Sequence, residues 1–326
     1  MRTQTLRTLL LPLAITVLSG ATDTASAQNY PTRPLTMVVP YAAGGGSDIY
    51  LRIVSEKLSQ NIGQPVLVSN RPGAGGNLGA ASVASAPPDG YTLLSANIAH
   101  VISNFVGEKP NYNIITDFEP VTLLGSTPFV VIVGKHVNAI NLRELIAYAK
   151  ANPGKLTYGT SGLGSTSHLA VELMKARANF DILHVPYKGG APVVPDILSG
   201  RIDITLLTGP SAVPLMNNNS AKAFAVTGKN RSPLARSVPT ASEEGVPNYN
   251  VAPWYSVLAP AKTPNFIISR LNESLHQTMK DTAVETKLRD LWFDVQVSTP
   301  QEMKAFIQSE TNTWKETVAR AGIKAE

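Results

Sequence analysis

Two glycine- and hydroxyl-rich segments, 44–48 and 159–168, have the clearest capacity to bind a ligand. The first reads Gly-Gly-Gly-Ser-Asp, and the second reads Gly-Thr-Ser-Gly-Leu-Gly-Ser-Thr-Ser-His. Neither contains Lys or Arg, so backbone N–H groups and hydroxyls such as Ser47, Ser161 and Ser165 would supply the hydrogen bonds. Such groups suit a carboxylate, because hydrogen bonds to a charged group contribute about 1.5–3 kcal/mol each.

Each segment stands between a predicted strand and a predicted helix. Leu35–Val39 is an apolar, β-branched run before the first segment, and apolar residues recur at helical spacing over 49–58. Residues 156–158 and 169–174 flank the second segment in the same way. N–H groups at a helix start are unpaired and carry the positive end of the helix dipole. Two such helix starts predict an anionic ligand between them.

The rest of the chain alternates between short strands and helices. Further strands are predicted at 65–70, 91–95, 129–133, 182–185, 202–207, 221–226 and 255–259. Further helices are predicted at 80–86, 141–151, 193–198, 265–282, 283–291 and 300–321. This alternation predicts an α/β fold with a parallel sheet covered by helices on both faces. Thr299 and Glu302 have the spacing of a capping box for the last helix.

The N-terminus predicts export. Arg2 and Arg7 precede the apolar run 9–18, and Ala-Ser-Ala ends at Ala27, so residues 1–27 are predicted to be a signal peptide that is cleaved near Ala27. Removing Arg2, Arg7 and Asp23 leaves 26 basic and 22 acidic residues, a net charge of +4. A periplasmic location is the simplest interpretation.

Composition excludes several classes of function. The basic residues are scattered, which argues against nucleic-acid binding. The chain has no cysteine, and after residue 27 no apolar run is long enough to anchor it in a membrane. The five histidines lack metal-ligand spacing, and no glycine-rich segment matches a phosphate-binding or dinucleotide-binding motif. We therefore predict no metal and no cofactor.

A periplasmic serine hydrolase is the alternative. The residues Gly-Thr-Ser-Gly-Leu at 159–163 nearly match the nucleophile elbow G-x-S-x-G, with Leu163 in place of the last glycine. Ser161 or Ser165 would then act with His168 as its base.

Five blocks of sequence resemble the periplasmic solute receptors of tripartite tricarboxylate transporters, the Bug family. The blocks are 30–48, 66–80 with 88–94, 158–169, 184–203, and 231–249 followed by Trp254 and 259–264. The resemblance implies a type II periplasmic binding protein, in which two α/β domains joined by two crossover strands close over a ligand. Domain 1 would comprise 28–128 plus 252–326, and domain 2 would comprise 129–251.

The resemblance also implies a site in which two loops and two waters hold a ligand carboxylate. Carried over position by position, its ligand-binding residues are Tyr41, Ala43, Gly44, Ser47, Asp48, Thr160, Ser161, Gly164, Ser165, His168, Tyr187, Lys188, Gly189 and Asp203. The protein would be a non-enzymatic monomer that delivers its ligand to the membrane permease of the transporter, or a receptor that feeds a signalling partner. Candidate ligands are di- and tricarboxylates, acidic amino acids and aromatic carboxylates such as terephthalate.

Some positions depart from the family pattern. Tyr41 stands where Phe is usual, and the segments 95–97 and 208–211 differ from the usual residues after their strands. Tyr41, Phe129 and Trp254 predict aromatic walls for the pocket, with core packing as the alternative for Phe129. Gly44 and Gly164 are predicted to allow the backbone to approach the ligand closely.

Overall fold

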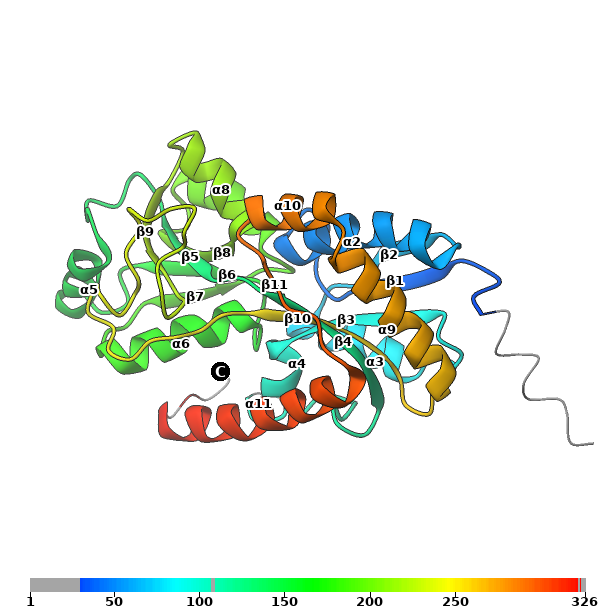
Figure 1. Ribbon diagram of the computed structural model, residues 1–326. Helices are drawn as coiled ribbons and strands as arrows, with labels where there is room; N and C mark the ends of the chain where they lie inside the picture. The colour runs from blue at the N-terminus through cyan, green and yellow to red at the C-terminus, as the bar shows by residue number, and fades with distance from the viewer. Residues whose placement is uncertain (1–29, 107–108, 322, 324–326) are drawn as a thin grey trace, which may run out of the picture. The chain divides into compact units, whose positions relative to one another are not determined.

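The computed structural model describes residues 30–106, 109–321 and 323, and two β-sheets with their helices make up its α/β fold (Figure 1). The predicted signal peptide lies outside the described residues. The strands are β1 (Leu35–Val39), β2 (Val66–Asn70), β3 (Thr92–Asn97), β4 (Phe118–Ser126), β5 (Phe129–Val133), β6 (Thr157–Thr160), β7 (Leu183–Pro186), β8 (Ile204–Thr208), β9 (Lys222–Val226), β10 (Trp254–Pro260) and β11 (Asp294–Val295).

The helices follow the strands along most of the chain. They are α2 (Gly46–Ile62), α3 (Asn77–Ala84), α4 (Ile98–Ile102), α5 (Leu142–Ala151), α6 (Thr166–Ala178), α7 (Val194–Ser199), α8 (Gly209–Asn217), α9 (Asn265–Met279), α10 (Thr282–Asp290) and α11 (Pro300–Ala321), with the short 3-10 helices η1 (Ala74–Gly76) and η2 (Ala191–Val193). None of these helices is long and apolar enough to cross a membrane.

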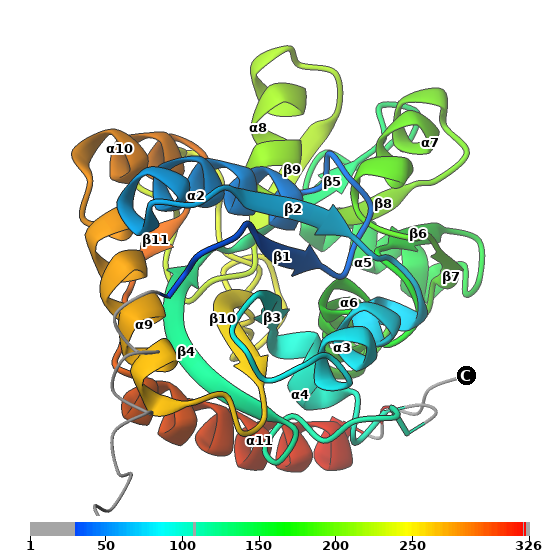
Figure 2. The ribbon, with the colours of Figure 1, turned by 90° about the vertical axis from the view of Figure 1, so that its right-hand side faces the viewer.

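The first sheet has the strand order β11-β4-β10-β3-β1-β2. β1 pairs in parallel with both β2 and β3, whereas β10 is antiparallel to β3 and β4. Figure 2 shows the curved β4, with α9 and α11 packed beside it. α2 packs against β1, β2 and α9.

The second sheet has the order β7-β6-β8-β5-β9. β6 is parallel to β7 and β8, and β5 is antiparallel to β8 and β9. Both sheets are therefore mixed, which corrects the prediction of a parallel sheet. Four of the strands with antiparallel pairings, β4, β5, β9 and β10, stand next to the points where the chain passes between the sheets.

The chain passes between the sheets twice. It leaves the first sheet after β4 and enters the second at β5, and it returns along 227–253 to β10. The two passages are hydrogen-bonded to each other, because the N–H of Thr127 donates to the carbonyl of Pro253 at 2.9 Å. The N–H of Phe129 also donates to Thr227 Oγ1 at 2.9 Å. These bonds hold the ends of both sheets close together.

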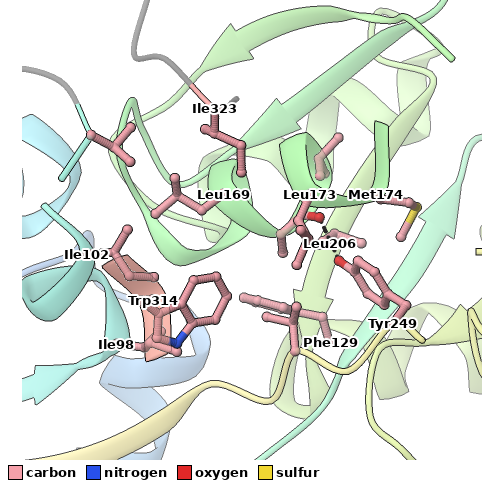
Figure 3. Packing of buried hydrophobic residues seen from close by; sticks show 14 of the residues in the cluster. Ile98, Ile102, Phe129, Leu169, Leu173, Met174, Leu206, Tyr249, Trp314 and Ile323 are labelled. Carbon is pink, nitrogen blue, oxygen red and sulfur yellow. Dashed lines mark hydrogen bonds between the residues drawn. The ribbon is translucent and has the colours of Figure 1, made fainter. Parts of the chain in front are cut away.

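One hydrophobic cluster contains residues from both sheets. It includes Val38 and Leu94 of the first sheet, Val131 and Leu206 of the second, and Trp314 of α11. Figure 3 shows side chains of α4, α6 and α11 meeting Phe129 in this cluster, with the Tyr249 hydroxyl donating to the Ala170 carbonyl at 2.6 Å. α6 and α11 thus contribute to a core shared between the sheets.

Four elements, β4, α4, α8 and β11, are absent from the predicted strands and helices. In β4, Pro120 interrupts the apolar pattern, and proline cannot donate to a ladder. The β4–β10 pairing has a register shift between Val257 and Leu258, which face Thr122 and Pro120, so an irregularity accommodates the proline. α8 contains Pro210 and Pro214, which are not typical of a helix interior, but Pro210 stands in the first turn, where no N–H is needed.

Candidate functional site: a pocket at the strand ends of both sheets

A pocket lies where the carboxyl ends of β1, β3, β6 and β8 meet. Its volume is about 50 Å³, room for a few water-sized groups, because one water needs about 10–15 Å³. The residues that line it are Tyr41, Gly45, Gly46, Ser47, Asn97, Phe129, Ser161, Ser165, Thr166, Ser167, Gly190, Leu206, Leu207, Thr208, Ser211, Pro253 and Tyr255. Four predicted site residues, Tyr41, Ser47, Ser161 and Ser165, are among them.

The pocket has both polar and apolar lining residues, and none of the described residues that line it is charged. Three helices of eight or more residues begin at it: α2 at Gly46, α6 at Thr166 and α8 after Thr208. Their unpaired N–H groups and dipoles give this end of the pocket positive potential without Lys or Arg. The arrangement can therefore attract an anion by hydrogen bonds and dipoles.

The first loop is held by Asp48, which does not line the pocket. The Asp48 carboxylate accepts hydrogen bonds from the Gly44 N–H, Arg52 Nε and Asn70 Nδ2, each at 2.9 Å. Burial alone would raise the pKa of this carboxyl, but the three donors together lower it. Asp48 thus fixes the loop, and Ala43 and Gly44 are outside the lining as well. Ser47 is the predicted residue of this loop that reaches the pocket.

The second loop is stabilised by its own hydroxyls. Ser167 Oγ accepts the Ser161 N–H at 3.0 Å, and Ser165 Oγ accepts the His168 N–H at 3.4 Å as the helix cap of α6. Thr160 Oγ1 lies 2.7 Å from His184 Nε2 and accepts the Gly162 N–H at 3.2 Å. Thr160 therefore supports the loop from behind and does not line the pocket.

Thr166 is the exception among these hydroxyls. Its side chain is 6% exposed and lines the pocket, yet Thr166 Oγ1 has no hydrogen-bond partner among the described residues. A buried hydroxyl without a partner costs free energy. Since Oγ1 belongs to a residue that lines the pocket, a bound acceptor there would satisfy it.

His168 faces the loop backbone. Its Nδ1 accepts the Gly164 N–H at 3.2 Å, and its ring stacks on His184 with 4.2 Å between the ring centroids. Burial and, to a smaller extent, the neighbouring His168 lower the pKa of His184 to about 4. The pocket is lined by Ser161 and Ser165 but not by His168 or Gly164.

Aromatic residues form one side of the pocket. The Tyr41 hydroxyl donates to the Gly75 carbonyl at 3.1 Å, and burial raises the pKa of Tyr41. Burial also raises the pKa of Tyr255 to about 12, against the effect of its hydrogen bonds with Ser47 and Thr208. Phe129 lines the pocket as predicted. Trp254 does not, because its indole N–H donates to Glu310 at 2.8 Å elsewhere in the fold; the neighbouring Tyr255 takes the predicted place.

The segment 187–189 joins the two loop regions rather than lining the pocket. The Tyr187 hydroxyl donates to Asp196 at 2.6 Å, and the Lys188 carbonyl accepts the Ala42 N–H at 3.1 Å. A Cβ on Gly189 would lie 3.0 Å from the Ala42 nitrogen, so glycine allows this approach. The next residue, Gly190, reaches the pocket.

Asp203 lies away from the pocket, which corrects its prediction. It precedes β8, whose other end, Thr208, lines the pocket. The Asp203 carboxylate accepts the Thr157 N–H at 2.7 Å and lies 2.8 Å from His136 Nε2. It therefore joins the starts of β6 and β8, at the opposite end of these parallel strands.

The family pattern missed residues at and just after the carboxyl ends of β3 and β8. Asn97, Thr208 and Ser211 line the pocket, although the sequence marked 95–97 and 208–211 only as departures from the family. Ligands of α/β proteins bind at the carboxyl ends of parallel strands, and this rule would have indicated Asn97 and Thr208. Among the described residues, no group of three His, Cys, Asp or Glu side chains could hold a metal ion.

The fold is that of a periplasmic binding protein. The fold of two mixed sheets with their helices matches the structure of the periplasmic binding protein BugD, with 31% identity, a TM-score of 0.87, and coverage of 90% of this chain and 100% of that chain. The chain belongs to the tripartite tricarboxylate transporter family receptors, whose family model matches residues 50–323. The resemblance seen in the sequence is thereby confirmed.

Two similar structures contain small carboxylates. Rpa4515 of R. palustris with adipate is 36% identical, with a TM-score of 0.87 and coverage of 90% of this chain and 99% of that chain. MatC (Rpa3494) from Rhodopseudomonas palustris with bound malate is 31% identical, with a TM-score of 0.85 and coverage of 89% and 100%. Because the family is one of receptors, the protein is a binding protein and not an enzyme, and the hydrolase alternative is wrong.

Proposed function

We propose that this protein is a periplasmic receptor that binds a small carboxylate in the pocket between its two sheets. The observation that carries the proposal concerns Thr166, which lines a pocket where three helices begin and whose buried hydroxyl has no hydrogen-bond partner in the described part of the chain. A carboxylate oxygen can accept this hydroxyl and the adjacent helical N–H groups together. Hydrogen bonds of this kind contribute about 1.5–3 kcal/mol each.

The ligand class is supported by the similar structures with adipate and malate. The small volume and the uncharged lining favour a compact ligand held by one carboxylate at the start of α6. The candidate ligands are di- and tricarboxylates, acidic amino acids and aromatic carboxylates. Phe129 and Tyr255 offer an apolar surface to the part of such a ligand that lies beyond its bound carboxylate. Ser47, Ser161, Ser165 and Tyr41 remain the proposed ligand contacts from the predicted set.

The two sheets would belong to separate domains, 28–128 plus 252–326 and 129–251, that close over the ligand. Support comes from the contact between their loops, in which the Ala42 N–H donates to the Lys188 carbonyl. Domain closure of this kind removes the ligand from water and strengthens its hydrogen bonds. The loaded receptor, a monomer exported by cleavage after residue 27, would then dock on the permease of its transporter.

The test is calorimetric titration of the purified protein with a panel of carboxylates, including adipate, malate, citrate and terephthalate. Thr166→Val keeps the shape of the side chain and removes the hydroxyl. We expect it to weaken binding of the best ligand by about 1.5–3 kcal/mol while the protein stays folded.

Ser274→Ala is the matched control, since Ser274 Oγ is also buried without a partner but lies in α9, outside the pocket. The affinity of the Ser274→Ala variant for the ligand should equal that of the wild type. Equal affinity in the Thr166→Val variant, or no binding by any member of the panel, would contradict the proposal.

A further inference from the structure

A second cavity lies between α6 and α11. Its volume is about 440 Å³, and it shares no lining residue with the carboxylate pocket. Its lining includes Leu173 and Arg177 of α6, Phe306 and Glu310 of α11, and the amide side chains of Asn250 and Gln296. We refer to it as the α6–α11 cavity. Pockets for small molecules usually have volumes of about 300–1,000 Å³.

Glu310 is the negative group of this cavity. Its Oε2 accepts the Trp254 indole N–H at 2.8 Å, and Trp314 also hydrogen-bonds the carboxyl. Burial raises the pKa of Glu310, although the two indoles act in the opposite direction. No cation of the described chain forms an ion pair with it. A carboxylate desolvated in this way lacks the positive partner that would stabilise its charge.

Arg177 is the positive group, and it comes from the other wall. Its Nη1 donates to the backbone carbonyls of Pro247 and Asn248. Nε and Nη2 make no hydrogen bond to the described residues, so the N–H edge of the guanidinium that binds a carboxylate bidentately is available. Arg177 and Glu310 line the same cavity but form no ion pair with each other.

We propose that the α6–α11 cavity binds a zwitterion of the α-amino acid class. The ammonium group would pair with the Glu310 carboxylate, and the carboxylate group would pair with the Arg177 guanidinium. Leu173 and Phe306 offer apolar surface to the side chain of the ligand, while Asn250 and Gln296 provide amide groups on the same lining. A ligand with both charges satisfies both protein groups, whereas a simple cation or anion leaves one of them unpaired.

The experiment is calorimetric titration of the exported chain with L-leucine and L-glutamine. Isoamylamine and isocaproate are matched controls, because they are leucine without its carboxylate and without its ammonium group. We expect saturable binding of at least one amino acid, and binding at least about tenfold weaker for the two controls.

Three variants locate the bound molecule. Glu310→Gln and Arg177→Gln should each weaken amino acid binding at least about tenfold, whereas Thr166→Val, in the carboxylate pocket, should leave it unchanged. Arg177 is exposed, so its variant tests the site even if Glu310→Gln destabilises the fold. The proposal is overturned if neither amino acid binds the folded protein, if Arg177→Gln binds as the wild type does, or if Thr166→Val abolishes binding.

Discussion

Asn97 and Tyr41 are hydrogen-bonded across the wall of the carboxylate pocket, with 3.1 Å between Asn97 Nδ2 and the Tyr41 hydroxyl oxygen. Asn97 ends β3, and Tyr41 follows β1, so the bond joins two neighbouring strand ends. Asn97 Oδ1 also accepts the Ala99 N–H at 3.0 Å, which caps α4. The Tyr41 hydroxyl, which phenylalanine would lack, therefore fixes a residue of the pocket lining.

Tyr41→Phe should lower the free energy of unfolding by about 1 kcal/mol, because Asn97 Nδ2 and the Gly75 carbonyl lose a buried partner. Urea unfolding of the ligand-free protein measures this change. Tyr148→Phe is the control, since Tyr148 is 50% exposed. Equal stability of Tyr41→Phe and the wild type would mean that the hydroxyl contributes nothing at this position.

Gly46 determines how closely the two sheets approach at the pocket. A Cβ at Gly46 would overlap Thr208 Oγ1, and no such obstacle lies within 4 Å of a Cβ at Gly164. The sequence had assigned close approach to Gly44 and Gly164, so the structure moves this role to Gly46. We expect Gly46→Ala to weaken carboxylate binding at least about tenfold, since closure would be blocked.

A double-mutant cycle with Thr208→Ala tests this steric cause. Removing Oγ1 should restore part of the affinity that Gly46→Ala loses, so the two changes should not be additive. Gly164→Ala serves as the comparison. The positive φ of 72° at Gly164 strains alanine there, so this variant should lower the stability of the protein without blocking closure. Unchanged affinity in Gly46→Ala would remove the steric argument.

Carboxylate binding should depend weakly on salt. The pocket is lined by hydroxyls and helix N-termini without a charged side chain, and interactions inside a closed pocket are screened little. We expect the affinity to change less than about threefold between low and high salt in calorimetry. A tenfold loss would instead indicate that a charged side chain such as Lys188 contacts the ligand.

Stability should fall as the pH is lowered from about 6.5 to 4. His100 is fully buried, and this burial lowers its pKa from 6.5 to about 4, although hydrogen bonding with the Asn97 backbone acts against it. Between these two values the unfolded chain binds a proton that the native protein does not, so the native state loses on the order of 3 kcal/mol. The stability of the native state is therefore free of this loss above about pH 6.5, and the loss is complete below about pH 4.

Urea unfolding at about pH 7 and about pH 4.5 measures this dependence. His100→Asn should reduce the difference between the two conditions but not remove it, because the pKa of His184 is also lowered to about 4. An identical pH dependence in the wild type and His100→Asn would show that His100 does not resist protonation in the native protein.

Local sequence patterns predicted much of the fold. The strand–loop–helix units around β1 and β6 occur as expected, and the Thr299–Glu302 capping box is confirmed, since the Glu302 N–H donates to Thr299 Oγ1 at 3.2 Å and Glu302 accepts the Thr299 N–H at 2.8 Å. Patterns containing proline failed, as in β4 and α8, because neighbouring strands and helix position decide whether proline is tolerated. The mixed pairing of the sheets also escaped prediction, since strand direction is not encoded in an apolar run.

The sequence by itself determined the two glycine-rich loops, their hydroxyls and the family to which the chain belongs. Tertiary structure alone decided which side chains reach the pocket. Asp48 is bound by Asn70, 22 residues away, and Asp203 by Thr157, 46 residues away, so both carboxylates act within the fold. Thr166 Oγ1, in contrast, has no hydrogen-bond partner among the described residues, and Thr166 lines the pocket. The physical reason is that the hydrogen-bond partners of a buried polar group come from elements distant in the chain, and no local pattern specifies them.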